Sequence, residues 1–226
     1  MALTNYTTLQ TAVITELDRT GNTEFTTAVP DFITRAEAKM NRVLRLREME
    51  DVTTDTYSAA TSSYADRSMS LPARYIELLN LEHKVATADD TTYEPVIFVA
   101  PADMPKYYTT SSAGDLYYTL RDAIEYSHAV GVDHTIRFHY LKKLDIATDT
   151  TNWLLTNYPD AYLYGALVEA SVFIVDDQRA VGWLALFKAA MEDLQSLSER
   201  GRDDSQLDTS EIAGMSDRST FNILRG

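Results

Sequence analysis

The sequence contains no cysteine among its 226 residues. Disulfide bridges, thiolate metal sites and a cysteine nucleophile are therefore excluded. No run of about 18 apolar residues is present, so we expect no membrane-spanning helix. The first residues, Met1–Asn5, have neither a basic start nor an apolar core, so we expect no signal peptide. These absences predict a protein that is made in the cytoplasm and has no membrane partner.

Glycine and basic residues are also scarce. The eight glycines are widely spaced and form neither a phosphate-binding loop nor a dinucleotide-binding motif. Lys and Arg number 20 against 34 Asp and Glu, which gives a formal net charge of −14. Because neutralising phosphates needs clustered basic residues, such an acidic chain is a poor candidate for wrapping DNA.

Signals of catalysis or metal binding are weak. The four histidines are His83, His128, His134 and His139. On a strand, His134 and His139 would lie on opposite faces, so they cannot share a metal ion. His128 and His134 could meet across a turn at Gly131, but no carboxylate spacing completes a ligand set. We therefore expect no metal, no cofactor and no enzymatic activity.

Adjacent aspartates occur three times, at Asp89–Asp90, Asp176–Asp177 and Asp203–Asp204. A glycosidase needs two carboxyl groups held a few ångströms apart in a cleft. Aspartate is also favoured in turns and at helix starts. We interpret the three pairs as turn and cap residues.

Both ends of the sequence show helical periodicity. Apolar residues recur at intervals of three and four in three stretches: Tyr6, Leu9, Val13 and Leu17; Phe32, Ala36, Met40 and Val43; Leu184, Phe187, Met191 and Leu194. We expect a first helix capped by Thr4 and a second that follows Pro30. A helical hairpin is expected near the other end, with Pro159 opening its first helix and a junction at Asp176–Asp177.

The middle of the chain, from about Glu48 to Lys142, has the pattern of short strands separated by turns. Its clearest segment is His134–Leu141, in which Ile136, Phe138 and Tyr140 point to one face. This region predicts a small antiparallel sheet or sandwich. The predicted fold class is α+β, mainly α, with the N- and C-terminal helices in one bundle. The predicted parts are helices over 1–47, a β-rich insertion over 48–147, a helical hairpin over 148–200 and an extended tail over 201–226.

Basic residues gather on one flank of the second expected helix. Arg35, Lys39 and Arg42 follow helical spacing, with Arg45 nearby. They form either a solvated flank paired with local glutamates or a contact surface for an acidic partner or DNA. The 14 tyrosines are open to three interpretations: packing, a protein interface, or a platform for a sugar or base.

The predicted tail carries apolar residues near its end. Phe221 and Ile223 are two positions apart, so they share one face of an extended segment, with Leu224 and Arg225 beside them. Such a segment can add to a sheet edge or occupy a groove on a neighbouring protein. The alternative is a disordered end without a partner.

Three stretches resemble the adaptor, or head-completion, proteins of tailed bacteriophages. They are Asp31–Arg42 continuing through Leu44–Glu50, then Ser70–Leu78, then Thr151–Ala170. Their order and spacing match the family over roughly residues 5–200, with acidic residues at the hairpin corner where Asp176–Asp177 stand.

The resemblance implies a structural protein of the virion neck. Such adaptors form a ring, typically of twelve subunits, beneath the portal, where they extend the DNA channel and provide the platform for the tail. The implied partners are the portal protein, neighbouring adaptor subunits, a tail or nozzle protein, and genomic DNA that passes without specific binding. A negative channel wall would repel phosphates and let DNA slide.

Three alternatives remain open at this point. One is a tail-tube gatekeeper or terminator protein, although these are usually richer in strands. Another is a cytosolic hydrolase with an unrecognised acidic site. The third is a sugar-binding host-recognition protein, suggested by the tyrosine content.

Overall fold

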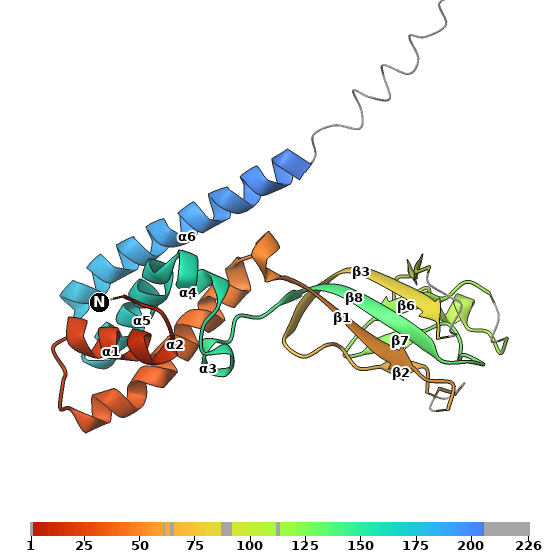
Figure 1. The fold of residues 1–226 in the computed structure, drawn as a ribbon, viewed down its shortest axis with the longest axis horizontal. Coiled ribbons are helices and arrows are strands. Elements are labelled where there is room, and N and C mark those ends of the chain that lie inside the picture. The colour runs from red at the N-terminus through yellow and green to blue at the C-terminus, as the bar shows by residue number, and fades with distance from the viewer. Residues whose placement is uncertain (1, 61, 64–65, 87–91, 112–113, 206–226) are drawn as a thin grey trace, which may run out of the picture. The chain divides into compact units, whose positions relative to one another are not determined.

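The computed structural model describes residues 2–60, 62–63, 66–86, 92–111 and 114–205. The chain divides into two compact units: a helical unit formed by residues up to Arg47 together with those from Ile146 onward, and a β unit formed by Glu48–Asp145. The elements are α1 (Tyr6–Glu16), α2 (Thr23–Val43), η1 (Arg47–Met49), β1 (Glu50–Tyr57), β2 (Ser68–Met69), β3 (Tyr75–Val85), β4 (Glu94–Pro95), β5 (Ile97–Phe98), η2 (Met104–Tyr107), β6 (Tyr117–Leu120), β7 (Ile124–Tyr126), β8 (His134–Lys142), α3 (Ile146–Asp149), α4 (Trp153–Asn157), α5 (Pro159–Phe173) and α6 (Asp177–Ser205) (Figure 1).

The predicted fold class, mainly α with one helical bundle and a single antiparallel insertion, is wrong. Strand makes up 22% of the structure against 45% helix, and the strands form two sheets of four. One sheet contains a parallel pair, β5 with β6, so the insertion is not purely antiparallel. The described residues contain six α-helices, including the short α3 and α4, and α5 packs against α1, α2, α4 and α6 as a central helix. Local periodicity identified the long helices but carried no information on these pairings.

Three helices of the helical unit approach one another closely at a glycine. A Cβ atom added at Gly165 of α5 would lie 3.0 Å from the Cβ of Ala36 on α2 and 3.0 Å from Cε2 of Phe187 on α6. The helical unit also contains large apolar side chains that are fully buried, among them Leu9, Phe32, Ile33, Met40 and Leu44. No described helix is both long and apolar enough to cross a membrane.

Two helix starts differ from the sequence prediction. α1 is capped by Asn5, whose side chain accepts a hydrogen bond from the N–H of Thr8, and not by Thr4. α2 begins at Thr23 and contains Pro30. The apolar stripe explains the earlier start, because Phe25 and Val29 are buried and continue the face of Phe32 toward the N-terminus. Burial of that stripe therefore outweighs the lost hydrogen bond at the proline.

A buried carboxylate links the two chain segments of the helical unit. Glu37 on α2 accepts hydrogen bonds from the N–H of Ile146 at 2.8 Å and from the hydroxyl of Tyr162 at 2.6 Å. The hydroxyl of Tyr162 also accepts a bond from the Asn152 amide at 2.6 Å. Burial and the charge of Glu37 raise the pKa of Tyr162. The phenol therefore stays a donor to Glu37 at neutral pH.

The β unit is a sandwich of two sheets. One has the strand order β1-β8-β3-β4 and is antiparallel throughout; the other has the order β2-β7-β6-β5. Their inner faces share one apolar core, in which the rings of Tyr57 and Tyr126 lie 4.4 Å apart. The alternation predicted for His134–Leu141 is confirmed, because Ile136, Phe138 and Tyr140 all point into this core.

The glycine crossing gives a prediction with a matched control. Gly165→Ala should lower the free energy of unfolding by about 1–2 kcal/mol, because overpacking outweighs the gain of about 1 kcal/mol in helix propensity. Gly182 lies in α6 with nothing within 4 Å of an added Cβ, so Gly182→Ala should stabilise by about 0.5–1 kcal/mol. Urea denaturation measures both. Equal stabilisation by the two substitutions would contradict the close approach at Gly165.

The Glu37 network gives a second prediction. Glu37→Ala leaves two buried donors unsatisfied and should cost about 3–4 kcal/mol, whereas Tyr162→Phe should cost about 1–2 kcal/mol. The control Lys39→Ala removes a half-exposed ammonium and should cost less than about 1 kcal/mol.

The same network has a pH dependence of defined sign. The pKa of Tyr162 is raised in the folded state, so ionisation of this phenol favours the unfolded chain. Stability should be complete below about pH 10, the ordinary pKa of tyrosine, and fall as the pH rises further. Thermal melts between pH 8 and pH 11.5 should show a shallower alkaline decline for Tyr162→Phe than for the unchanged chain. Identical alkaline declines would mean that Tyr162 is not responsible.

Candidate functional site

One side of the β sandwich is lined by a groove. β1 and β2 are the outer strands of the two sheets on that side, whereas β4 and β5, the outer strands on the other side, follow each other directly in the chain. The groove lies between β1 and the segment that follows β2, and its volume is about 470 Å³. Its lining comprises Asp51, Val52, Thr53, Thr54, Asp55, Ser70, Leu71, Pro72, Ala73, Arg74, Phe138, Tyr140 and Lys142.

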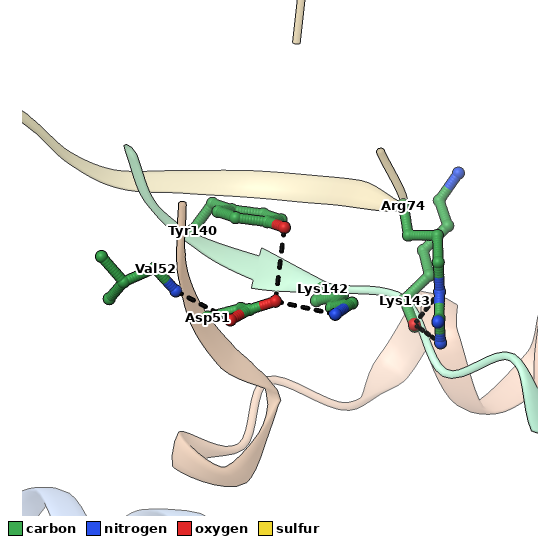
Figure 2. A network of polar contacts seen from close by, with 6 residues as sticks. All are labelled: Asp51, Val52, Arg74, Tyr140, Lys142 and Lys143. Atoms are coloured by element: carbon green, nitrogen blue, oxygen red, sulfur yellow. Dashed lines mark hydrogen bonds and ion pairs between the residues drawn. The ribbon is translucent and has the colours of Figure 1, made fainter. Parts of the chain in front are cut away.

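An ion pair fixes one end of this groove (Figure 2). The Asp51 carboxylate accepts from the ammonium of Lys142 at 2.8 Å and from the hydroxyl of Tyr140 at 3.4 Å. Burial acts to raise the pKa of Asp51, but Lys142 and the hydrogen bonds outweigh it and hold the pKa below its ordinary value. The bond to Asp51 in turn raises the pKa of Lys142. Both groups stay charged at neutral pH, so this pair is suited to fixing structure or binding a partner and not to proton transfer.

At the same end of the groove, Arg74 and Lys143 are joined by three hydrogen bonds (Figure 2). The guanidinium of Arg74 donates to the carbonyl of Lys143 from Nε at 3.1 Å and from Nη2 at 2.8 Å, while the N–H of Lys143 donates to the Arg74 carbonyl at 2.7 Å. Arg74 has φ of 62°, the left-handed region that costs a residue with a side chain about 1 kcal/mol or more. The contacts with Lys143 hold this strained backbone in place.

A second candidate surface lies at the turn between α5 and α6. Val172, Phe173, Val175 and Val181, which we call the α5–α6 corner, are exposed apolar side chains; Val175 is 79% exposed. The turn has the Schellman hydrogen bonds, from the N–H of Asp176 to Ser171 at 3.0 Å and from that of Val175 to Val172 at 3.2 Å.

Val175 occupies the position of that turn where glycine is usual. Its φ is 57°, which is unfavourable for a β-branched residue. A strained residue with an exposed apolar side chain lowers stability without improving the core. Such departures from local rules occur at functional sites, which favours the α5–α6 corner as a contact surface.

Three of the four predicted basic residues, Lys39, Arg42 and Arg45, contact groups of the same helical unit. Lys39 forms an ion pair with Glu169 of α5, and Arg42 donates to the Ala38 carbonyl at 3.0 Å. Arg45 donates to the carbonyls of Leu44 at 2.6 Å and Asn41 at 3.1 Å, which satisfies acceptors at the end of α2. Arg35 is exposed on the same helix. Contact of this stripe with an acidic partner stays a prediction.

The other predicted site residues, Phe221, Ile223, Leu224 and Arg225, lie outside the described residues. Of the predicted aspartate pairs, Asp89–Asp90 also lie outside them. Asp176 is confirmed as a cap residue, because its carboxylate accepts from the N–H of Arg179 at 3.1 Å at the start of α6.

The histidines form a pair that the sequence did not predict. Nδ1 of His83 lies 3.0 Å from Nδ1 of His134, with the two rings stacked across β3 and β8. His128 contacts Ser127, and burial followed by the influence of His83 lowers the pKa of His128. Within the described residues, no three His, Cys, Asp or Glu side chains are arranged to hold a metal ion.

Comparison with known proteins defines the class. The sequence profile of the family described as SU10 adaptor protein matches residues 4–210, nearly the whole chain. The class is therefore that of bacteriophage adaptor proteins, which are structural and not enzymatic. The chain belongs to the SU10 adaptor family, which confirms the resemblance found in the sequence. No curated protein matched the chain.

Substitutions at Arg74 can separate its side-chain contacts from its backbone strain. Arg74→Ala loses the guanidinium bonds and keeps the strain, so it should cost about 2 kcal/mol of stability. Arg74→Gly loses the same bonds but relieves the strain, so it should be more stable than Arg74→Ala by about 1 kcal/mol. Chemical denaturation of both variants measures this difference. A glycine variant less stable than the alanine variant would contradict strain at this position.

Proposed function

We propose that this protein is the head-to-tail adaptor of a tailed bacteriophage. It forms a ring of twelve subunits beneath the portal, extends the DNA channel and provides the platform on which the tail assembles. The family match over residues 4–210 carries this proposal. The family supports a virion component that contacts other virion proteins, and the portal, neighbouring adaptors and a tail or nozzle protein are the proposed partners.

The two surfaces of the structure support a role in binding. The α5–α6 corner presents apolar area to solvent, which is typical of a protein interface. The groove of the β unit has an ion pair at one end and a polar lining, features that suit recognition of another chain. We assign the corner to the portal contact, and Phe221, Ile223, Leu224 and Arg225 to contact with the portal or a neighbouring adaptor.

The net charge of −14 supports the proposal that the protein lines a channel through which DNA passes without being bound. Phosphates near a negative wall are repelled, so the genome can slide through without specific binding. The stripe of Arg35, Lys39, Arg42 and Arg45 is then directed at an acidic protein partner in the virion neck.

Mixing the purified protein with its portal tests the proposal directly. We expect the free chain to sediment as a monomer at micromolar concentration and to form a ring on the portal that is visible by electron microscopy. A closed ring without portal would contradict nucleation by the portal. Failure to bind the portal under any condition would contradict the adaptor role.

The α5–α6 corner provides matched variants for the same assay. Val181→Asp should weaken portal binding at least tenfold while leaving the melting temperature nearly unchanged, because Val181 is 69% exposed. Val132→Asp is the control, since Val132 is an exposed valine of the β unit. Val175→Gly should raise stability by about 1 kcal/mol through relief of strain. Equal portal binding by the Val181 and Val132 variants would exclude the corner as the contact.

A further inference from the structure

The groove of the β unit adjoins a strand edge that can accept another strand. In the described part of the chain, β1 pairs with β8 alone. The open side of an outer strand presents main-chain N–H and C=O groups to which an extended segment can add. The groove runs along this strand from Asp51 to Asp55. An added segment would therefore have both a main-chain partner and a place for its side chains.

Two aspartates protect this edge. The carboxylate of Asp51 accepts from the N–H of Val52 at 2.9 Å, and that of Asp55 accepts from the N–H of Thr56 at 2.7 Å. Donors that are already bonded resist pairing with an arbitrary strand. Asp51 is held by Lys142 as well, whereas Asp55 is exposed on the groove. A cation that engages Asp55 would release the Thr56 N–H for pairing.

The edge strand carries charge of one sign. Residues 50–57 contain Glu50, Asp51 and Asp55 and no basic residue. Asp55 shares a strand face with Tyr57, which is buried in the sandwich core. Leu71 and Phe138 supply apolar lining to the same groove. Arg74 and Lys142 also line the groove, but Lys142 pairs with Asp51 and the Arg74 guanidinium donates to the Lys143 carbonyl. Asp55 is therefore the acid available to an incoming cation, and the groove fits an extended segment that places apolar side chains and one cation on a single face.

The chain contains a segment with this pattern. Residues 218–225 carry two arginines and no acid, in a chain of net charge −14. In extended backbone, Phe221, Ile223 and Arg225 share one face. Two apolar side chains are therefore available for the lining of the groove, and a guanidinium is available for Asp55.

We propose that the groove of one subunit binds residues 218–225 of a second copy, which add to β1 while Arg225 pairs with Asp55. Residues 206–224 lie between Ser205 and Arg225, and at about 3.3 Å per residue they can span about 60 Å, enough to reach a neighbour. Each copy donates one segment and accepts another, a head-to-tail contact that can close into a ring. The inference rests on the proposed adaptor ring and names the contact that latches neighbouring subunits.

Cross-linking of full-length chains tests this contact. Because the sequence has no cysteine, an introduced thiol is unique. One copy carries Thr54→Cys on β1, and another carries Asn222→Cys. A short bismaleimide should join the two copies into a heterodimer, both on the portal and in concentrated free protein. The control replaces Thr54→Cys with Ile97→Cys, an exposed position on β5 at the other side of the sandwich, and should give no more than background.

Charge exchange tests the pairing itself. Asp55→Arg in the acceptor copy, or Arg225→Asp in the donor copy, should each lower the cross-linking rate about fivefold. Combining the two substitutions in one mixture should restore the rate. If the mixture with both substitutions cross-links no faster than the mixtures with one, the Arg225–Asp55 pair is overturned.

The outcomes distinguish this inference from the proposed function. Rings on the portal without the Thr54–Asn222 cross-link would overturn the inference and leave the adaptor role intact. The cross-link in free protein without any portal complex would support the inference and contradict the adaptor role. A chain with both cysteines that cross-links only within itself would show self-docking and overturn the assignment to a second copy.

Discussion

The hydrogen bonds of Glu37 make one helical unit from two distant parts of the chain. This buried carboxylate on α2 binds the N–H of Ile146 and the hydroxyl of Tyr162, so the segment that returns from the β unit is held against the segment that left it. The β unit favours this closure, since Glu50 at the start of β1 lies opposite Leu141 near the end of β8. A long insertion whose ends are already adjacent adds little closure entropy to the helical unit. A buried carboxylate is stable where donors such as these satisfy it.

Features set by local periodicity were predictable from the sequence, and features set by pairing between distant residues were not. Alternation identified β8, since Ile136 and Phe138 need only the period of a strand to share a face. Pro30 predicted the wrong start for α2, because proline is favoured in the first turn of a helix and was placed there. The helix begins earlier, at Thr23, because the buried Phe25 extends the apolar stripe toward the N-terminus. The stacking of His83 on His134 depends on the register between β3 and β8. No spacing in the sequence encodes that register.

The candidate surfaces could not be predicted from the sequence, because they also depend on contacts between distant residues. The groove combines residues of β1 with Ser70–Arg74 and β8, three stretches separated by tens of positions. Two further positions could be recognised as candidates only from their backbone conformation. Arg74 and Val175 both adopt left-handed conformations that glycine would adopt at lower cost, and each lies at a candidate interaction surface. A strained valine exposed to solvent lowers stability without improving the core, which favours a role for Val175 in contact with another protein.

Charge sets the remaining constraint on assembly. Subunits of net charge −14 repel one another, and salt screens this repulsion only beyond about 10 Å at 0.1 M. Association therefore needs contacts in which the charge is locally complementary or absent. The α5–α6 corner meets the second condition, since its side chains are apolar. In the contact proposed above, residues 218–225 would meet the first, because Arg225 would pair with Asp55 of β1. An acidic surface with a few such exceptions disfavours random aggregation while leaving a small number of defined contacts, and the proposed ring would depend on this selectivity.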